Sequence, residues 1–199
     1  ALPIYQFNSN NQEFNTALKS GGAFSRENLA GNSAYNGKNG KLSDSELIDV
    51  KVKNGTFKLA IEAGKAFQKM ADAAAAQGID TSLTDAYRTY EGQSNLFDWN
   101  NYVANGGSRQ DTPENRKCKK LGDGKRSCAK KDTNGGTATA FPGTSNHGLG
   151  KAIDVTHSEF RKFIRNNGVD YGWSWYEGRS VNEPWHFTYA PNKKDTWPI

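Results

Sequence analysis

The stretch "GTSNHGLGKAIDVTH", residues 143–157, contains two of the three histidines of the chain and an aspartate seven positions after the first of them. His147 lies among glycines, whose missing side chains let the backbone turn sharply and carry the imidazole toward the segment that follows. That segment, "KAIDV" at residues 151–155, predicts a strand with Asp154 on it. The stretch therefore predicts a tight turn that places a histidine beside a strand carrying a carboxylate.

The remaining histidine, His186, lies in "EPWHFTYA", residues 183–190. Aromatic residues and a threonine predict a strand there, antiparallel to residues 151–155. His186 and Asp154 can then project from one face of the sheet toward His147. Zinc enzymes typically hold the metal with three such side chains and leave a fourth position open. These three residues therefore form a candidate metal site.

Glu183, three residues before His186, is the candidate general base, because a carboxylate beside the metal can accept a proton from the attacking water. In a straight strand, side chains three positions apart point to opposite faces. The chain must therefore bend between these two residues. Pro184 cannot donate a hydrogen bond to a sheet, so we expect the bend there.

The residues alone leave a simpler interpretation open. His147 could be an ordinary turn residue, Asp154 an exposed carboxylate, and His186 one of many half-buried histidines that pack among aromatic rings. His157 is expected at the head of a helix, facing away from this site, as a solvated surface histidine.

The whole chain predicts a single domain, residues 1–199, of the α+β class. Its length allows a substantial core, and its helices precede most of its strands. Residues 1–55, rich in Asn, Gly and Ser, are expected to be largely irregular, with short helical or strand pieces packed on the core. We predict helices at residues 56–76 and 90–104, and in the second of them Leu96, Phe97 and Val103 are available for burial. A third helix is expected to begin after a capping box formed by Thr156 and Glu159. Strands are predicted at residues 79–87, 151–155, 171–178 and 183–190.

A basic insertion at residues 106–136 interrupts this domain. It holds nine Lys or Arg against four acidic residues, which accounts for the whole net charge of +5. Cys118 and Cys128 flank a Gly-Asp-Gly turn within it and predict a disulfide-closed hairpin, because two cysteines are too few for a structural zinc site. A disulfide indicates an oxidising, extracytoplasmic setting.

At this point the sequence resembles a known family. "SNHGLGKAID" followed by "EPWH" matches the Ser-x-His-x-x-Gly-x-Ala-x-Asp and Glu-x-Trp-His motifs of zinc D-Ala-D-Ala carboxypeptidases, which include vancomycin-resistance dipeptidases and carboxypeptidases and several phage cell-wall peptidases. "DAYRTYEGQ" and "NGKLSDSEL" resemble upstream segments of the same family. The resemblance covers roughly residues 36–190 apart from the basic insertion, and it implies a Hedgehog/D-Ala-D-Ala peptidase-like fold.

The resemblance also implies roles for individual residues. His147, Asp154 and His186 would hold Zn²⁺, and Glu183 would be the catalytic base. Arg88 would contact the substrate, either anchoring a carboxylate or polarising the scissile carbonyl. Ser145 and Gln93 would assist it in binding substrate. Without the motif, Arg88 would be read as a surface salt-bridge partner.

The implied function is hydrolysis of peptidoglycan stem peptides next to D-Ala, as a D-Ala-D-Ala carboxypeptidase or DD-endopeptidase. Phage L-Ala-D-Glu endopeptidases usually have Asp in place of the Glu of "EPWH", which modestly favours the first specificity. A second alternative is a non-catalytic zinc module of the Hedgehog type, against which Glu183 and Arg88 argue. We expect a monomer that neither crosses a membrane nor binds nucleic acid, and whose basic insertion either attracts anionic wall polymers or is simply solvated.

Overall fold

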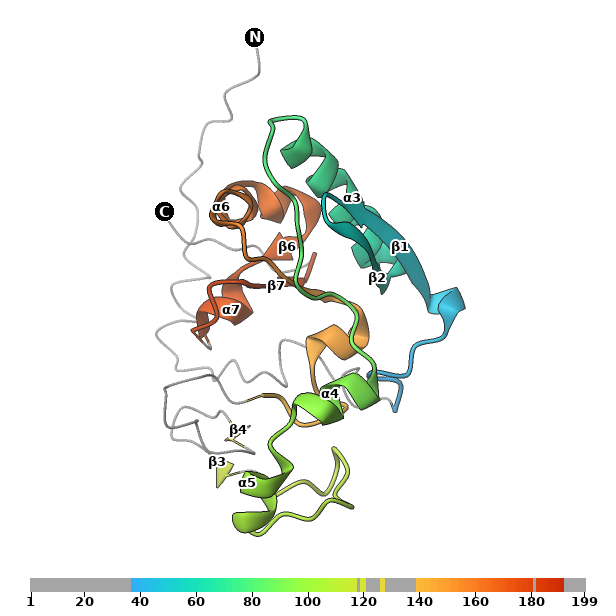
Figure 1. Ribbon diagram of the computed structural model, residues 1–199, viewed down its shortest axis with the longest axis vertical. Coiled ribbons are helices and arrows are strands. Elements are labelled where there is room, and N and C mark those ends of the chain that lie inside the picture. Colours follow the sequence, from blue (N-terminus) through green and yellow to red (C-terminus); the bar gives the residue numbers. More distant parts are fainter. Residues whose placement is uncertain (1–36, 118, 121–125, 128–138, 181, 192–199) are drawn as a thin grey trace, which may run out of the picture.

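The computed structural model describes residues 37–117, 119–120, 126–127, 139–180 and 182–191. Its strands form small antiparallel sheets, and helices pack against them (Figure 1). The prediction of an α+β fold with a small antiparallel sheet is therefore confirmed. Of the helices in these residues, none combines the length and the apolar character that crossing a bilayer requires.

The helices, 3-10 turns and strands have the following bounds. The helices are α3 (Ile61–Ala75), α4 (Tyr90–Leu96), α5 (Trp99–Ala104), α6 (Ser158–Asn167) and α7 (Tyr176–Ser180), and the short 3-10 turns are η2 (Asp44–Glu46), η3 (Asn146–Leu149) and η4 (Gly168–Tyr171). The strands are β1 (Leu47–Val52), β2 (Gly55–Ala60), β3 (Lys119–Lys120), β4 (Arg126–Ser127), β5 (Ala152–Asp154), β6 (Trp173–Ser174) and β7 (His186–Tyr189).

The three-stranded sheet has the order β5-β7-β6, with β7 in the middle. β5 and β7 run antiparallel, and their register sets Asp154 directly opposite His186. The antiparallel pairing expected between these two segments is confirmed. Residues directly opposite in such a pair have side chains on the same face, about 4.5–5.5 Å apart at Cβ, so the register itself brings these two candidate ligands together.

The first hairpin corrects the predicted start of the first long helix. β2 pairs along its whole length with β1, from Leu47 opposite Ala60 to Val52 opposite Gly55. Residues 47–52 form a short strand of the kind expected within residues 1–55. The helix expected from residue 56, in contrast, begins only at Ile61. The reason is the tight turn at Lys53 and Asn54, which joins β1 to β2. Gly55, the first residue of β2, has φ +142°, a value that favours glycine.

The predicted strand at residues 79–87 does not form a ladder and makes only an isolated bridge between Asp85 and Asp154. The helix predicted at residues 90–104 is divided in two, because Phe97 has extended backbone angles and Asp98 caps α5 by accepting the N–H of Asn101 at 3.0 Å.

Burial in this region also differs in part from the prediction. Phe97 is buried as expected, in a small aromatic cluster with Tyr102 and Phe141. Leu96 and Val103 are instead 56% and 44% exposed. The division of the helix turns both of these side chains away from the cluster that surrounds Phe97.

Two more local predictions are wrong. α6 begins at Ser158 with His157 at its N-cap and no side-chain capping bond, so the Thr156–Glu159 capping box does not form. Of the strand predicted at residues 171–178, only Trp173 and Ser174 pair with β7, and the chain then enters α7.

The main core lies between α3, the sheet and α6. The apolar face of α3 is buried, as its spacing predicted, and Phe67 makes edge-to-face contacts with Phe160 at 6.4 Å and Trp173 at 5.7 Å between ring centroids. Aromatic pairs of this kind add about 0.5–1.5 kcal/mol to the energy of burial. The packing holds β6 and α6 against α3 and so supports the sheet that carries Asp154 and His186.

The basic insertion is described only in part. β3 and β4 pair antiparallel, Lys119 opposite Ser127 and Lys120 opposite Arg126, in agreement with the predicted hairpin. Cys118 and Cys128 lie outside the described residues, so the disulfide stays a prediction, as does the structure of residues 1–36.

Candidate active site

The turn that carries His147 is held on both sides by backbone hydrogen bonds. Gly148 O accepts the N–H of Gly40 at 2.6 Å, and Gly150 O accepts the N–H of Ala60 at 3.0 Å. Gly150 has φ +63°, and a Cβ there would lie 2.5 Å from the nitrogen of Ala60. Only glycine therefore suits this position, and the turn is fixed between the start of the described chain and the end of β2.

His147 itself is buried and oriented by its neighbours. Ser145 caps η3 by accepting the backbone N–H of His147 at 3.3 Å. The Nδ1 of the imidazole lies 2.7 Å from the carbonyl oxygen of Ala86. Because a carbonyl oxygen can only accept, Nδ1 carries the proton and Nε2 is left with a lone pair.

The three candidate metal ligands come together in space. His147 Nε2 lies 3.3 Å from Asp154 Oδ1, and His186 Nδ1 lies 3.0 Å from the same oxygen. One ligand atom from each residue falls within 4.8 Å of the others. In a tetrahedral zinc site with bonds of about 2.0–2.1 Å, ligand atoms lie roughly 3.3 Å apart. The residues present therefore fit a zinc ion.

The electrostatics of these residues also suit a cation. Burial opposes ionisation of Asp154, but the adjacent imidazoles of His147 and His186 outweigh it and hold the pKa of the carboxyl below its ordinary value. Burial likewise opposes the charged form of His186, yet hydrogen bonds to Asp154 and Glu177 raise the pKa of its imidazole above the ordinary value. Because a metal binds the deprotonated imidazole, a cation bound here would displace the proton from His186.

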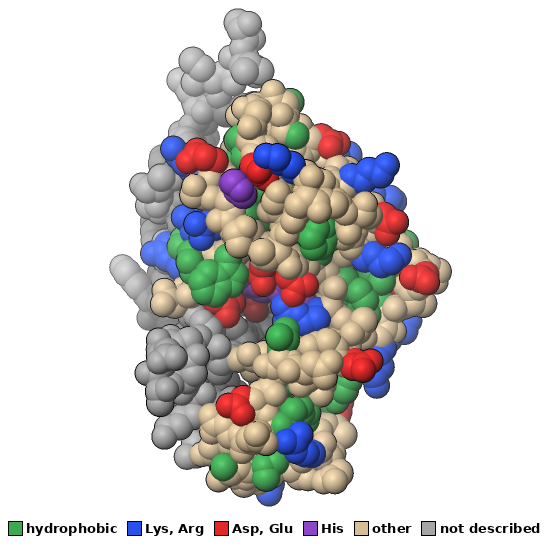
Figure 2. Space-filling model, in the orientation of Figure 1, with side chains coloured by type: hydrophobic (Ala, Val, Ile, Leu, Met, Phe, Trp, Pro, Cys, Tyr) green, Lys and Arg blue, Asp and Glu red, His purple; other side chains and the backbone are tan. Residues whose placement is uncertain are grey.

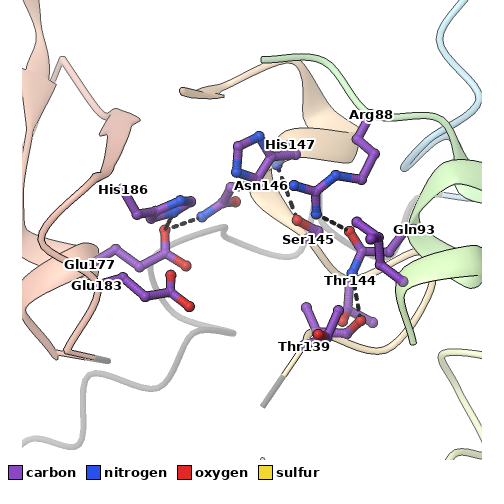
Figure 3. Close-up of a pocket in the computed structure, with 12 residues that line it drawn as sticks. Arg88, Gln93, Thr139, Thr144, Ser145, Asn146, His147, Glu177, Glu183 and His186 are labelled. Carbon is purple, nitrogen blue, oxygen red and sulfur yellow. Dashed lines mark hydrogen bonds and ion pairs between the residues drawn. The ribbon is translucent and has the colours of Figure 1, made fainter. Parts of the chain in front are cut away.

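Glu183 lies where the chain bends before β7, as expected from Pro184. Its carbonyl oxygen accepts the indole N–H of Trp175 at 3.0 Å, and its backbone N–H bonds to Gly178 O at 2.7 Å. Arg165 of α6 donates to Pro184 O at 3.0 Å. These bonds fix the turn, and Glu183 points into the cavity beside His186 (Figure 3).

Arg88 lies on the opposite side of the cavity, between two acceptors. Its Nε donates to Asp85 Oδ2 at 2.8 Å, its Nη2 bonds to the same oxygen, and its Nη1 donates to Gln93 Oε1 at 2.7 Å. The amide of Gln93 in turn donates to Ala140 O at 2.8 Å. Within the described residues, one further N–H on each terminal nitrogen is left for a substrate oxygen.

These groups share one cavity of about 210 Å³ (Figure 3). Its lining consists of Arg88, Gln93, Leu96, Thr139, Ala140, Thr144, Ser145, Asn146, His147, Glu177, Glu183 and His186. In the view of Figure 2, acidic and basic side chains lie next to one another near the middle of the face. All the predicted site residues except Asp154 therefore line the cavity, and Asp154 lies against it through His147 and His186.

Three residues of the site were not singled out from the sequence. Glu177 and Asn146 line the cavity, and Asp85 holds Arg88. Glu177 lies in a segment predicted to be a strand, and nothing in its spacing connects it with His186. The position of Asp85, three residues before Arg88 in an otherwise uncharged run, could have indicated that the two form an ion pair. His157 is 51% exposed and pairs with Asp80 at 3.4 Å, away from the site, as expected.

The comparison with protein families agrees with this geometry. The model of VanY, D-alanyl-D-alanine carboxypeptidase, matches residues 56–192. This range is more than half of the chain and includes every predicted site residue. Among curated proteins, no sequence matches that of the chain.

Several solved structures are similar to this chain. One is the vancomycin-resistance D,D-pentapeptidase VanY of a VanB-type resistance cassette, in complex with Zn(II), with 24% identity over 73% of this chain and 80% of that chain and a TM-score of 0.46. VanYB in complex with D-alanine-D-alanine is 23% identical over 75% and 81% of the two chains, with a TM-score of 0.47. The LD-carboxypeptidase LdcB is 22% identical over 77% and 72%, with a TM-score of 0.49.

Proposed function

The chain belongs to the VanY family of D-alanyl-D-alanine carboxypeptidases, and from this premise we propose that it is a zinc peptidase that hydrolyses peptidoglycan stem peptides next to D-Ala. One observation carries the proposal. The ligand atoms of His147, Asp154 and His186 converge at one wall of the cavity, and Glu183 and Arg88 line the same cavity from different elements.

His147, Asp154 and His186 would hold the zinc ion, through Nε2, Oδ1 and Nδ1 respectively. When bound, zinc supplies a Lewis acid that polarises a carbonyl and lowers the pKa of a bound water to about 7. The remaining steps fall to side chains of the protein.

Glu183 would accept a proton from the attacking water and return it to the leaving nitrogen, so that the peptide C–N bond breaks with release of a neutral amine and not of an amide anion. Its backbone is fixed on both sides, which limits the directions in which the carboxylate can point. A carboxylate held at the cavity wall is suited to transferring one proton between two positions.

Arg88 would bind the substrate through the two N–H groups that its partners leave open. Its Nη2 lies 4.0 Å from Asp154 Oδ2, next to the candidate metal ligands. This proximity favours polarisation of the scissile carbonyl over anchoring a distant carboxylate. Gln93 would keep the guanidinium in place, and Ser145 would contact the peptide beside it.

A substrate of this kind lies outside the cytoplasmic membrane, so we also propose an extracytoplasmic location. Phage or bacterial wall lysis is compatible with such an activity. Positive charge in the basic insertion would add attraction to anionic wall polymers.

Digestion of purified stem peptides, followed by mass spectrometry, tests the proposal. Zinc-loaded protein should release alanine from a pentapeptide ending in D-Ala-D-Ala, and the Glu183→Gln variant should not. Cleavage between L-Ala and D-Glu would establish the endopeptidase alternative. Zinc binding without cleavage of any stem peptide or cross-linked dimer would instead establish a non-catalytic module.

A further inference from the structure

Glu177, in α7, is a carboxylate that the chemistry described above does not use. It is only 4% exposed, although it lines the cavity of the site. Burying a carboxylate is costly unless hydrogen bonds or an opposite charge compensate it. The contacts of Glu177 therefore indicate why it is placed there.

One oxygen of Glu177 makes two contacts with the metal-binding elements. Its Oε2 accepts a hydrogen bond from the side-chain amide of Asn146 at 2.5 Å and lies 3.4 Å from His186 Nε2 (Figure 3). Asn146 directly precedes His147 in η3, whereas His186 begins β7. Glu177 thus connects the turn that carries one candidate ligand with the strand that carries another.

The two contacts of His186 lie on opposite sides of its ring. Nδ1 faces Asp154 and the candidate metal position, and Nε2 faces Glu177. When one imidazole nitrogen binds a metal, the other keeps the proton and requires an acceptor, which fixes the tautomer and the ring orientation. His147 has a backbone carbonyl in this role, and His186 has a carboxylate.

We propose that Glu177 is the positioning residue of the metal centre, which holds the His186 ring with Nδ1 toward the metal and ties the ring to the η3 turn through Asn146. The proposal rests on the metal site described under the proposed function. A carboxylate acceptor also makes the imidazole a stronger donor to a metal than a carbonyl acceptor does. Glu177 and Glu183 then have separate tasks, one at the ligand and one at the substrate.

Zinc affinity tests this proposal without any assay of activity. The dissociation constant would be measured by competition with a chromophoric chelator for the wild-type protein, Glu177→Ala, Glu177→Gln and the control Glu159→Ala, whose side chain is exposed on α6. Loss of a partner that orients a metal ligand typically weakens binding about 10–100-fold. We expect Glu177→Ala near the upper end of this range.

Glu177→Gln should recover part of this loss and remain about tenfold weaker than wild type. Its amide oxygen can still accept both hydrogen bonds, but it lacks the charge. This variant also answers the question if Glu177→Ala does not fold. Glu159→Ala should bind zinc as the wild-type protein does.

The visible spectrum of the cobalt-substituted protein provides a second readout, because the d–d bands respond to ligand geometry. They should shift in both Glu177 variants and not in Glu159→Ala. Zinc affinity within twofold of wild type in Glu177→Gln, with an unchanged cobalt spectrum, would overturn the proposal. If the wild-type protein binds zinc but cleaves no peptide, the proposed function fails and this inference still stands; if it binds no zinc, both fail.

Discussion

The two sides of the cavity are built differently. On the metal side, pairing of backbone strands positions candidate ligands. On the other side, a series of side-chain hydrogen bonds positions Arg88. Asp154 and His186 are set opposite each other by the β5–β7 register. Arg88 depends on Asp85 and Gln93, whose side chains come from extended segments and the short helix α4. Replacing one side chain on the metal side leaves the β5–β7 register intact. Replacing one side chain on the Arg88 side removes hydrogen bonds on which its neighbours depend for their positions.

This difference predicts that the two sides can be separated by mutation. Substitutions on the metal side should change metal content and the rate of the chemical step. Substitutions on the Arg88 side should lower kcat/KM while zinc stays bound.

The largest effect should come from the shared ligand Asp154. In Asp154→Ala, both histidines lose the carboxylate between them, and we expect zinc content to fall far below one equivalent. Activity should then drop by more than the roughly 10⁴-fold upper limit for loss of a general base alone. Elemental analysis and peptide hydrolysis on one sample measure both quantities, and retention of stoichiometric zinc with measurable activity would remove Asp154 from the site.

Glu183→Gln should separate chemistry from metal binding on the same side. We expect kcat to fall about 10²–10⁴-fold, the usual contribution of general acid–base catalysis, with zinc content unchanged. The measurement is steady-state kinetics on a stem pentapeptide. Wild-type turnover in this variant would show that another group transfers the proton.

Arg88→Lys should affect the other side. Lysine keeps the charge but cannot hold Asp85, Gln93 and the substrate in one plane. Hydrogen bonds to charged groups contribute about 1.5–3 kcal/mol, so kcat/KM should fall roughly 10- to 150-fold. Gln93→Ala should have a weaker effect in the same direction, and a loss of zinc in either variant would contradict the separation of the two sides.

Gly150→Ala tests the turn that supports His147. Its φ of +63° and the 2.5 Å approach of a Cβ to Ala60 N should both destabilise the variant. Gly78→Ala is the matched control, because Gly78 has φ +76° with open space around it. The control should lose about 1 kcal/mol of unfolding free energy, and Gly150→Ala distinctly more, as measured by urea denaturation. Equal losses would mean that the close contact is relieved without cost.

The smallest effect should come from the basic insertion. Replacing Lys119, Lys120 and Arg126 by Gln should slow digestion of intact walls at low salt by no more than about tenfold, with the difference vanishing as salt screens the charges. Hydrolysis of a small soluble peptide should not change. Unaltered digestion of walls at low salt would leave the insertion without a steering role.

The sequence predicted the metal side of this site better than the rest of the fold. The strands of Asp154 and His186 and the bend at Pro184 follow from local signals, namely aromatic residues, a glycine-rich turn and a missing donor. The β1–β2 hairpin carried a signal too, since Asn54-Gly55 between alternating residues is typical of a hairpin. The apolar spacing of the helix overlaps the residues of β2, so helix was predicted there instead.

Other features depend on contacts between distant segments, which no local pattern reveals. Glu177 meets Asn146 across 31 positions of the chain. The Thr-rich composition of the segment with Asp85 predicted a strand. Within the described residues this segment makes only one isolated bridge, to Asp154, and so does not join the sheet as a further strand. Such long-range placement arises only when the whole core packs.

Anomalous diffraction at the zinc absorption edge, from crystals of the zinc-loaded protein, tests the metal site most directly. We predict one strong peak at about 2.0–2.2 Å from His147 Nε2, Asp154 Oδ1 and His186 Nδ1, with Glu183 facing the open coordination position. Zinc held by other residues, or no peak between these three residues in protein that contains one equivalent of zinc, would contradict the proposed metal site.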